Sequence, residues 1–356
     1  MPAERRASIV GTGLIGASVA LALREQGWTV SGTDADGVRT REALAAGVID
    51  AVGLDPDADL VVVAVPVSSV VDAARDALVG CPKATVTDVG SVKAPIVTAV
   101  NDSRFVGGHP MAGSEHDGLK GADANLFQGA TWVLTPTEMT ETARYAALRA
   151  TISSIGADVV ELPPERHDAL VALVSHVPHL TAATLMGIAA SSAEEHATLL
   201  RLAAGGFRDM TRIAAGHPAI WPDICAENRD AIVAGLDALL AALADVRLAV
   251  ADSDRPELLR RLELARAARI NLPARVAQAD ELVEVRIPVP DRAGVLAEVT
   301  TLAGELDVNI VDLEIAHSVE GDRGVLIVTI DAQAADRVCD ALTSRGYRPA
   351  AVPIGR

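Results

Sequence analysis

One glycine-rich stretch, Gly11-Thr-Gly-Leu-Ile-Gly16, constrains the fold more than any other part of the sequence. A short apolar strand (7–10) precedes it, a helical segment (17–27) follows, and a second strand (28–33) ends directly before Asp34. The first glycine allows a tight turn, the second lets the backbone approach a pyrophosphate, and the third lets the helix pack on the strand. Strand, glycine triplet, helix, strand and acid together predict a dinucleotide-binding fold.

The carboxylate of Asp34 indicates which dinucleotide is bound. It comes 23 residues after Gly11, where an acid accepts hydrogen bonds from the ribose hydroxyls and repels a 2′-phosphate. NAD is therefore favoured over NADP, although Arg39 is near enough in sequence to keep the NADP option open. The pyrophosphate is expected at the positive end of the helix that follows the triplet.

Strands and helices continue to alternate up to residue 161. Ligands of such sheets bind at the carboxyl ends of the strands, so the loop that follows the apolar strand 59–65 is expected to lie against the cofactor. Ser91 follows the strand 84–88 and is either a helix N-cap or a hydroxyl that contacts substrate or nicotinamide. Further strands are expected at 105–107, 131–135 and 157–161. The expected cofactor-binding residues are Gly11, Gly13, Leu14, Ile15, Gly16, Asp34, Val65, Pro66 and Ser91.

A histidine stands where the strand that begins at Phe105 gives way to glycines. Gly107 and Gly108 permit unusual backbone angles, and Pro110 disfavours the helical conformation at His109. We expect His109 in a rigid loop at the strand end, where an imidazole that titrates near neutrality can serve as a general base. A surface-loop histidine without a task is the alternative that this stretch alone leaves open.

From residue 163 to about 279 strand patterns vanish and helices are predicted. Pro178 lies inside the apolar segment 165–188, so a kink is expected there. The histidines of this segment either bind a metal, form hydrogen bonds within a buried helix, or contact substrate; no carboxylate or cysteine of obvious spacing completes a metal site, and no metal is expected. These histidines are His167, His176 and His179.

Two arginines four residues apart, Arg208 and Arg212, follow a pair of glycines. The formal net charge of -17 repels an anionic substrate, so local cations must hold one if it binds. A guanidinium binds a carboxylate through two parallel hydrogen bonds. We expect one of the two arginines to do so and at least one to lie on an exposed turn.

The same composition limits the partners and the compartment. The acidic balance makes nucleic acid and anionic membrane surfaces unfavourable partners, and no apolar run reaches the roughly 18 residues of a membrane span. Three cysteines without disulfide or metal spacing fit a cytoplasmic protein. A long helix (224–250) and a second helix capped by Asp254 carry long apolar stripes, which suggest a helical homodimer interface.

The tail reads as a small α+β module. Strand 282–288 alternates apolar and polar residues. The segment 291–303 is expected to be a loop that leads into a helix, and Gly304 can end that helix. Two strands (308–315 and 324–330), a helix (332–344) and a last strand (349–352) complete the order βαββαβ.

Five motifs in order give the chain a specific resemblance. The first 280 residues resemble the prephenate/arogenate dehydrogenase family, and the tail resembles an ACT domain, a module that usually binds an amino-acid effector. The tail departs from that pattern at Ala293, where the family usually has proline, which bears on the stiffness of the effector loop. The matching motifs are Gly11-Thr-Gly-Leu-Ile-Gly16, Asp88-Val-Gly-Ser-Val-Lys93, Gly108-His-Pro-Met-Ala-Gly113, Ser175-His-Val-Pro-His179 and Phe207-Arg-Asp-Met-Thr-Arg-Ile-Ala214.

The resemblance implies three domains and a reaction. It implies a Rossmann-type dinucleotide-binding domain (1–161), an all-α substrate and dimerisation domain (162–279) and a C-terminal ACT domain (280–356). The implied reaction is the NAD-dependent oxidative decarboxylation of prephenate to 4-hydroxyphenylpyruvate in tyrosine biosynthesis, with tyrosine as the expected effector. By resemblance His109 is catalytic, Ser91 orients it, and Arg212 binds the ring carboxylate. The other implied contacts are Glu115, His179, Asp209 and Trp221 for substrate and Gly294, Asn309 and Ile310 for effector.

Three alternatives stay open at this point. Arogenate, which carries an amino group in place of the side-chain keto group, is an alternative substrate. A β-hydroxyacid dehydrogenase also joins a dinucleotide fold to helices, but it needs a lysine in the helical domain, and no lysine occurs after Lys120. The third alternative is a non-catalytic sensor that binds NAD or an amino acid.

Overall fold

The structure, a computed structural model, describes residues 5–114, 118–195, 203–271, 282–290, 292, 294–317 and 323–353. The chain divides into two compact units. The first comprises Met1–Thr184 and Ile213–Leu240, and the second comprises Leu185–Arg212 and Ala241–Arg356. Glu115, an expected substrate contact, and Ala293 lie outside the described residues.

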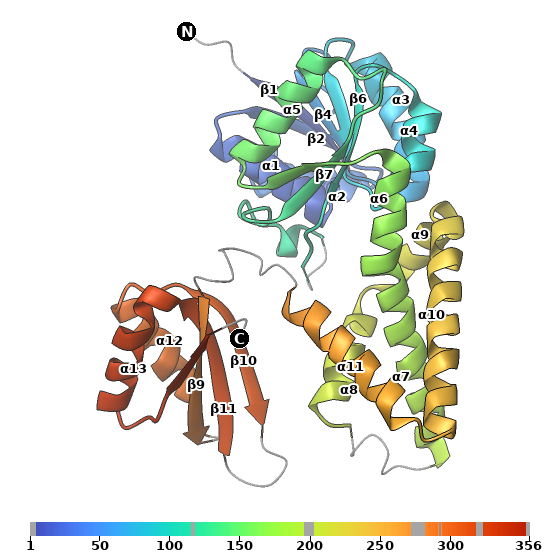
Figure 1. Ribbon diagram of the computed structural model, residues 1–356. Helices are drawn as coiled ribbons and strands as arrows, with labels where there is room; N and C mark the ends of the chain where they lie inside the picture. The colour runs from blue at the N-terminus through green and yellow to red at the C-terminus, as the bar shows by residue number, and fades with distance from the viewer. Residues whose placement is uncertain are drawn as a thin grey trace. The chain divides into compact units, whose positions relative to one another are not determined.

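An eight-stranded sheet forms the centre of the first unit (Figure 1), in the order β3-β2-β1-β4-β5-β6-β7-β8. Neighbours from β3 to β6 are parallel, β6 and β7 are antiparallel, and β7 and β8 are parallel. The order 3-2-1-4-5-6 is that of a dinucleotide-binding fold, so the predicted Rossmann-type domain is confirmed. The strands are β1 (Arg6–Val10), β2 (Thr29–Thr33), β3 (Ala51–Val52), β4 (Leu60–Val63), β5 (Thr85–Asp88), β6 (Phe105–Pro110), β7 (Thr131–Thr135) and β8 (Asp158–Glu161).

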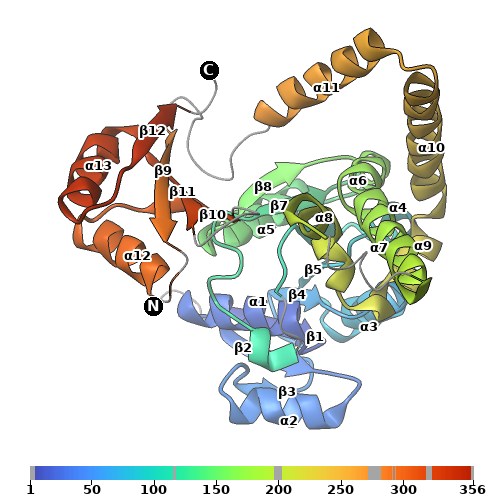
Figure 2. The same cartoon turned by 90° about the horizontal axis from the view of Figure 1, so that it is seen from below.

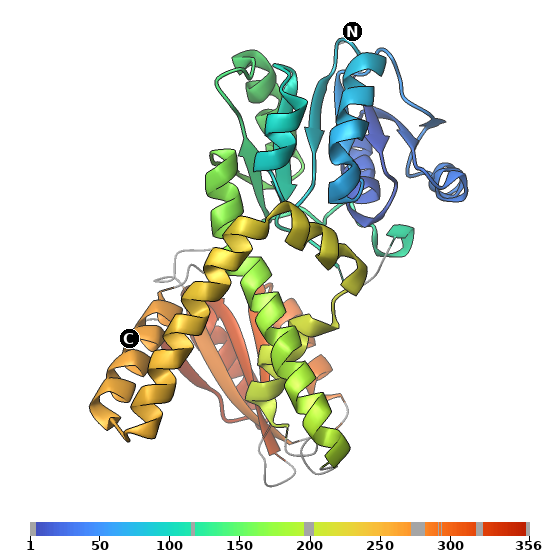
Figure 3. The ribbon, with the colours of Figure 1, turned by 90° about the vertical axis from the view of Figure 1, so that its right-hand side faces the viewer.

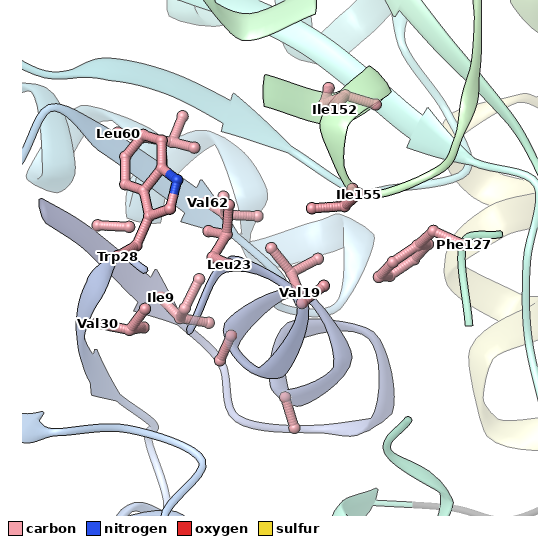
Figure 4. Packing of buried hydrophobic residues seen from close by; sticks show 14 of the residues in the cluster. Ile9, Val19, Leu23, Trp28, Val30, Leu60, Val62, Phe127, Ile152 and Ile155 are labelled. Atoms are coloured by element: carbon pink, nitrogen blue, oxygen red, sulfur yellow. The ribbon is translucent and has the colours of Figure 1, made fainter. Parts of the chain in front are cut away.

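Helices cover both faces of this sheet, and β3 with α2 forms one edge (Figure 2). On the α1 side, one apolar cluster contains Ile9 of β1, Val19 and Leu23 of the helix, and Ile152 and Ile155 (Figure 4). A separate apolar cluster on the α3 and α4 side covers β4 and β5. Burial of each Leu or Ile side chain stabilises the fold by roughly 1.5–3 kcal/mol relative to leaving it exposed. The helices are α1 (Leu14–Glu25), α2 (Gly37–Ala45), η1 (Val67–Ser69), α3 (Val70–Gly80), α4 (Ala94–Val100), η2 (Gly118–Gly121) and α5 (Thr142–Ser154).

A nearly continuous helical run leads out of the sheet. Near Pro178, where a kink is predicted, the structure has a π-helical segment that ends two residues before the proline. Proline has no N–H to donate one turn back, to the carbonyl of Val174 inside that segment, so the regular ladder cannot continue there. By length and composition this run, Pro164–Ser191, could cross a membrane, but it carries buried residues of the site described below. Its parts are α6 (Pro164–Val171), η3 (Ala172–His176) and α7 (Val177–Glu195).

A second long helix lies beside α7 (Figures 1 and 3). The approach is close, because a Cβ on Gly235 would lie 2.9 Å from a methyl of Val177. The prediction of one helix over 224–250 is wrong at one point, since Asn228 (φ -111°, ψ 30°) separates two helices. The elements here are η6 (Pro218–Ile220), α9 (Trp221–Glu227) and α10 (Arg229–Ala251).

The second unit contains the predicted βαββαβ module. Its sheet has the order β10-β11-β9-β12 with every pair antiparallel, and two helices cover one face (Figure 1). Asp254 caps its helix as expected, accepting the Glu257 N–H at 3.1 Å. The elements of this unit are α8 (Gly205–Thr211), α11 (Arg255–Ile270), β9 (Leu282–Pro290), α12 (Val295–Glu305), β10 (Ile310–His317), β11 (Arg323–Asp331), η8 (Ala332–Ala334), α13 (Ala335–Ser344) and β12 (Ala350–Pro353). The short helix η5 (Arg212–Ala215) directly follows α8, and all but its first residue belong to the first unit.

Candidate functional site

The glycine-rich turn between β1 and α1 has the geometry that its sequence predicts. Gly11 adopts φ 97°, a left-handed angle that side chains resist. A Cβ on Gly16 would lie 1.9 Å from the Gly11 carbonyl oxygen, so helix and turn can meet only at a glycine. A Cβ on Gly13 would meet nothing within 4 Å. The turn therefore leaves open space over Gly13, and contact of these residues with a cofactor stays a prediction.

Asp34 is held at the end of β2 with its carboxylate facing the same turn. One oxygen accepts the Thr12 N–H at 2.8 Å and the other accepts the Asp36 N–H at 2.9 Å. The first of these oxygens also accepts the Thr12 hydroxyl at 3.3 Å. A carboxylate has about four lone-pair directions, so the other oxygen retains capacity for a ribose hydroxyl. The loop after β4 is also anchored, because the Ser68 hydroxyl donates to Asp223 of α9 at 2.7 Å.

His109 lies in a strand, so the expectation of a loop histidine is wrong. The first half of β6 pairs parallel with β5, and its second half pairs antiparallel with β7, where His109 faces Val133. The side chain is buried, with 9% of the residue exposed. Pairing with β7 therefore fixes the backbone of His109 more firmly than a loop would.

Gly107 and Gly108 also act differently from the expectation. Neither has a positive φ. A Cβ on Gly108 would lie 2.6 Å from the Asp88 carbonyl oxygen, and one on Gly107 would lie 2.4 Å from the Thr135 hydroxyl oxygen. The two glycines therefore permit close strand packing beside His109 rather than a special backbone angle.

A chain of hydrogen bonds connects His109 to helix α6. Its Nδ1 lies 2.8 Å from Nε2 of His167, whose Nδ1 lies 2.8 Å from the carboxylate of Asp168. Asp168 also accepts the backbone N–H groups of Lys93 and Ala94, each at 2.8 Å. It therefore caps α4 from another element. The alternative that made Ser91 the N-cap is wrong, since the N-cap residue is Lys93 and its side chain does not cap.

A buried ion pair supports the backbone under His109. Lys93 and Asp88 are both fully buried, and the ammonium contacts the carboxylate and donates to the Gly108 carbonyl at 2.9 Å. Asp88 in turn accepts the Gly108 N–H at 3.1 Å and the Gly90 N–H at 2.9 Å. Burial lowers the pKa of Lys93, and the attraction of Asp88 opposes that shift. The pair holds both polar groups of Gly108.

Helix α9 brings a second group of side chains to α6 and α7. Asn228 donates to the Asp168 carbonyl at 3.0 Å and to Nδ1 of His176 at 3.2 Å. The ring of His179 stacks on Trp221 with centroids 3.7 Å apart and planes 14° apart. Two residues expected to line the substrate pocket thus lie together, and their contact with substrate stays a prediction.

Three of these histidines are neutral at physiological pH. Burial, with the nearby His167, Lys93 and His176, holds the pKa of His109 well below 6.5. Burial lowers the pKa of His176 to about 4 and lowers that of His179 as well. In the described part of the chain, no three histidine, cysteine or acidic side chains gather as metal ligands would. A neutral, immobilised imidazole can accept a proton.

The remaining expected site residues lie in and after α8, in the loop before α4 and in the C-terminal module. Asp209 lies in α8 and Arg212 directly follows it; both are exposed. Ser91 is half-buried in the loop between β5 and α4. Gly294 forms the left-handed N-cap of α12 with φ 94°, and Asn309 and Ile310 lead into β10. The roles assigned to these residues stay predictions.

Sequence reasoning missed most of the polar network. Lys93 lies in a matched motif and His167 in an expected helix, but the sequence alone gives neither of them a partner. The available signal was a His-Asp pair in the first turns of an apolar helix, because charged side chains are rarely buried there unless paired. The missed residues are Asp88, Lys93, Asp168 and Asn228.

Comparisons with known proteins point to one family, prephenate dehydrogenase. The family model for the nucleotide-binding domain of prephenate dehydrogenase matches residues 19–161, and that for its dimerization domain matches 163–264. Prephenate dehydrogenase of Bacillus subtilis (strain 168) is 33% identical over 339 residues, 91% of each chain.

Two solved structures are similar to this chain. The structure of prephenate dehydrogenase from A. aeolicus in complex with hydroxyphenyl propionate and NAD+ has a TM-score of 0.71 and 30% identity, and covers 76% of this chain and 99% of that chain. The Synechocystis arogenate dehydrogenase structure has a TM-score of 0.67 and 31% identity, and covers 74% of this chain and 98% of that chain.

The fold and the glycine-rich turn define a dinucleotide-dependent dehydrogenase with a buried histidine at its sheet. The family matches make the class more specific. The chain belongs to the prephenate dehydrogenase family.

Proposed function

We propose that this chain catalyses the NAD-dependent oxidative decarboxylation of prephenate to 4-hydroxyphenylpyruvate, the step that leads toward tyrosine. One observation carries the role of its site: His109 is buried in β6 and paired with Val133 of β7, and its pKa lies well below 6.5, so the imidazole is neutral. The family of the chain and its similarity to the A. aeolicus enzyme in complex with NAD+ and hydroxyphenyl propionate support this reaction.

The residues present fit NAD. Open space above Gly13 and the tight turn at Gly11 leave room for a pyrophosphate at the first turn of α1. Asp34 would accept the ribose hydroxyls and would repel a 2′-phosphate. When bound, NAD takes up the hydride that leaves C4 of the substrate.

His109 handles the proton of the 4-hydroxyl group. It accepts this proton while the C4 hydride leaves, and the bond between the ring and its carboxylate breaks to release carbon dioxide. The electron pair of that bond completes the aromatic ring. The proton then returns from His109 to the phenolate oxygen, so substrate dianion and oxidised cofactor give product monoanion, carbon dioxide and reduced cofactor. Aromatisation makes the step downhill, so the protein mainly orients the reactants and holds charge.

Arg212 is proposed to bind the ring carboxylate, and Ser91, Glu115, His179, Asp209 and Trp221 to orient substrate. A fork of two charge-assisted bonds suits Arg212 to this task. We expect Arg212→Ala to raise KM for prephenate at least tenfold, since each such bond contributes about 1.5–3 kcal/mol, and to leave KM for NAD unchanged. Steady-state kinetics with each reactant varied would show this. An unchanged KM for prephenate would remove the role, and Arg208→Ala is the matched control.

Arogenate is the second candidate substrate. The similar Synechocystis structure bears that name, at 31% identity. Turnover measured on both compounds decides between them.

The C-terminal module is proposed to be an ACT domain that binds an amino acid, with tyrosine as the first candidate. Its βαββαβ order and the left-handed Gly294 before α12 support this assignment. We also propose that the three domains meet at residues 161 and 279. The helical domain is proposed to form a homodimer, and the protein is proposed to be cytoplasmic. A thermal shift with tyrosine, phenylalanine and tryptophan tests the effector, and no shift with any of them would sink it.

The decisive experiment measures NADH formation from prephenate, with and without tyrosine. NADH and 4-hydroxyphenylpyruvate in equal amounts are expected. Absence of NADH with both prephenate and arogenate would refute the enzyme and favour a sensor.

A further inference from the structure

We propose that His167 and Asp168 are positioning residues that hold His109 in the tautomer whose Nε2 carries the lone pair. The inference rests on the proposed role of His109 as proton acceptor. It assigns a task to two residues of α6 that a helix cap or core packing alone would not require.

The first step concerns Asp168, which can only accept. Its carboxylate receives the N–H groups of Lys93 and Ala94, each at 2.8 Å, and lies 2.8 Å from Nδ1 of His167. An ionised carboxylate has no proton to donate. The proton between the two side chains therefore belongs to Nδ1 of His167.

The second step follows from the tautomer of His167. With Nδ1 protonated, the neutral ring presents a lone pair at Nε2. That atom lies 2.8 Å from Nδ1 of His109, and His167 is fully buried. His109 therefore donates from Nδ1, which leaves its Nε2 free to accept the substrate proton.

The third step explains why the carboxylate is a reliable anchor. Both oxygens of Asp168 are tied to the first-turn amides of α4, and its carbonyl accepts from Asn228 at 3.0 Å. Capping α4 needs only the carboxylate, so His167 is superfluous to the cap. During turnover the Asp168–His167–His109 chain also stabilises the imidazolium that forms on His109, until the proton returns to the product oxygen.

Two amide substitutions at one position separate this role from a structural one. His167→Asn keeps a donor near Nδ1 for Asp168 but loses the acceptor for His109. His167→Gln reaches the Nε2 position and can accept from His109 while losing the bond to Asp168. We expect kcat to fall by about 10²-fold or more in His167→Asn, the size of a lost general base, and by about tenfold in His167→Gln. KM for NAD should stay within twofold, by order of magnitude.

Controls and a second readout keep the test decisive. His217→Asn is the matched control, because His217 is exposed and asparagine can also cap the Ala219 N–H. In protein labelled with ¹⁵N at histidine, with signals assigned through His109→Asn, we expect protonated Nδ1 and unprotonated Nε2 at His109, and loss of this pattern in His167→Asn.

Three outcomes would overturn the proposal: the opposite tautomer in the unmodified protein, a kcat in His167→Asn at or above that of His167→Gln, or equal losses in both accompanied by lower melting temperatures. Failure of the unmodified protein to turn over prephenate would instead refute the proposed function, because the tautomer is measured without substrate.

Discussion

The cores around the two sheets of this protein differ in how many polar and charged side chains they bury. Around β5, β6 and α6, the core contains an ammonium, carboxylates and imidazoles. The core of the C-terminal sheet is built from aliphatic side chains, and the ion pairs of that module, such as Arg292 with Glu298, lie on its surface. In the described residues every buried polar or charged side chain precedes residue 229. Burying such groups costs free energy unless each is paired, so their concentration marks where chemistry is expected.

The largest effect should come from the histidine at the centre of the polar network. His109→Asn should lower kcat by roughly 10²–10⁴-fold, the usual contribution of a general base. Glu298→Gln, in the apolar module, should leave kcat unchanged without effector. Steady-state NADH formation compares the two, and near-normal turnover of His109→Asn would erase the distinction between the regions.

The next effect concerns the two kinds of ion pair. Lys93→Met leaves Asp88 charged and buried without its partner, which should destabilise the first unit by about 3–5 kcal/mol. Arg292→Met removes an exposed pair and should change stability little. Urea unfolding of both variants measures the difference. Equal small losses would mean that the buried pair is not needed for folding.

The next effect is a loss of stability at low pH, which is expected from the buried histidine His176 of the first unit. His176 has a pKa of about 4 in the folded protein and near 6.5 when unfolded. As the pH falls, the unfolded chain therefore binds a proton at His176 before the folded chain does. This favours unfolding, so the free energy of unfolding is unaffected above pH 6.5 and decreases by about 3 kcal/mol as the pH falls toward 4. His176→Asn should flatten this part of the pH profile of unfolding. A parallel profile in the variant would show that His176 does not contribute.

The smallest expected effect compares two glycines. Gly108→Ala would place a methyl 2.6 Å from a backbone oxygen and should destabilise by about 1–3 kcal/mol. Gly304→Ala lies in helix α12 with nothing within 4 Å, and should stabilise by up to about 1 kcal/mol. Thermal melts of both variants are sufficient. Shifts of the same sign would contradict the packing described here.

What could be predicted from sequence was what neighbouring residues determine. The turn from Gly11 to Gly16, the cap at Asp254 and the βαββαβ order depend on short-range patterns, and the structure has all three. The two-residue strand β3 has no pattern long enough to see. Two glycines and Pro110 predict a loop at His109, and its pairing with β7, more than twenty residues away, leaves no local pattern that would show the strand.

The polar network was out of reach for the same physical reason. Asp168 caps a helix that begins 74 residues earlier, at Ala94, and Asn228 contacts Asp168 across 60 residues. Only the folded backbone brings these groups together. Asn228 also interrupts the expected helix, which periodicity alone could not show.

The π-helical segment has a consequence for how the site tolerates change. Residues nine apart on a regular α-helix, at about 100° each, point to opposite sides, yet His167 and His176 are both buried and both reach the Asp168 and Asn228 pair. One extra residue in that wider turn rephases everything after it. Losing a single residue there would leave a regular helix that points His176 and His179 in other directions, so the orientation of these two rings depends on the length of the segment as well as on its sequence.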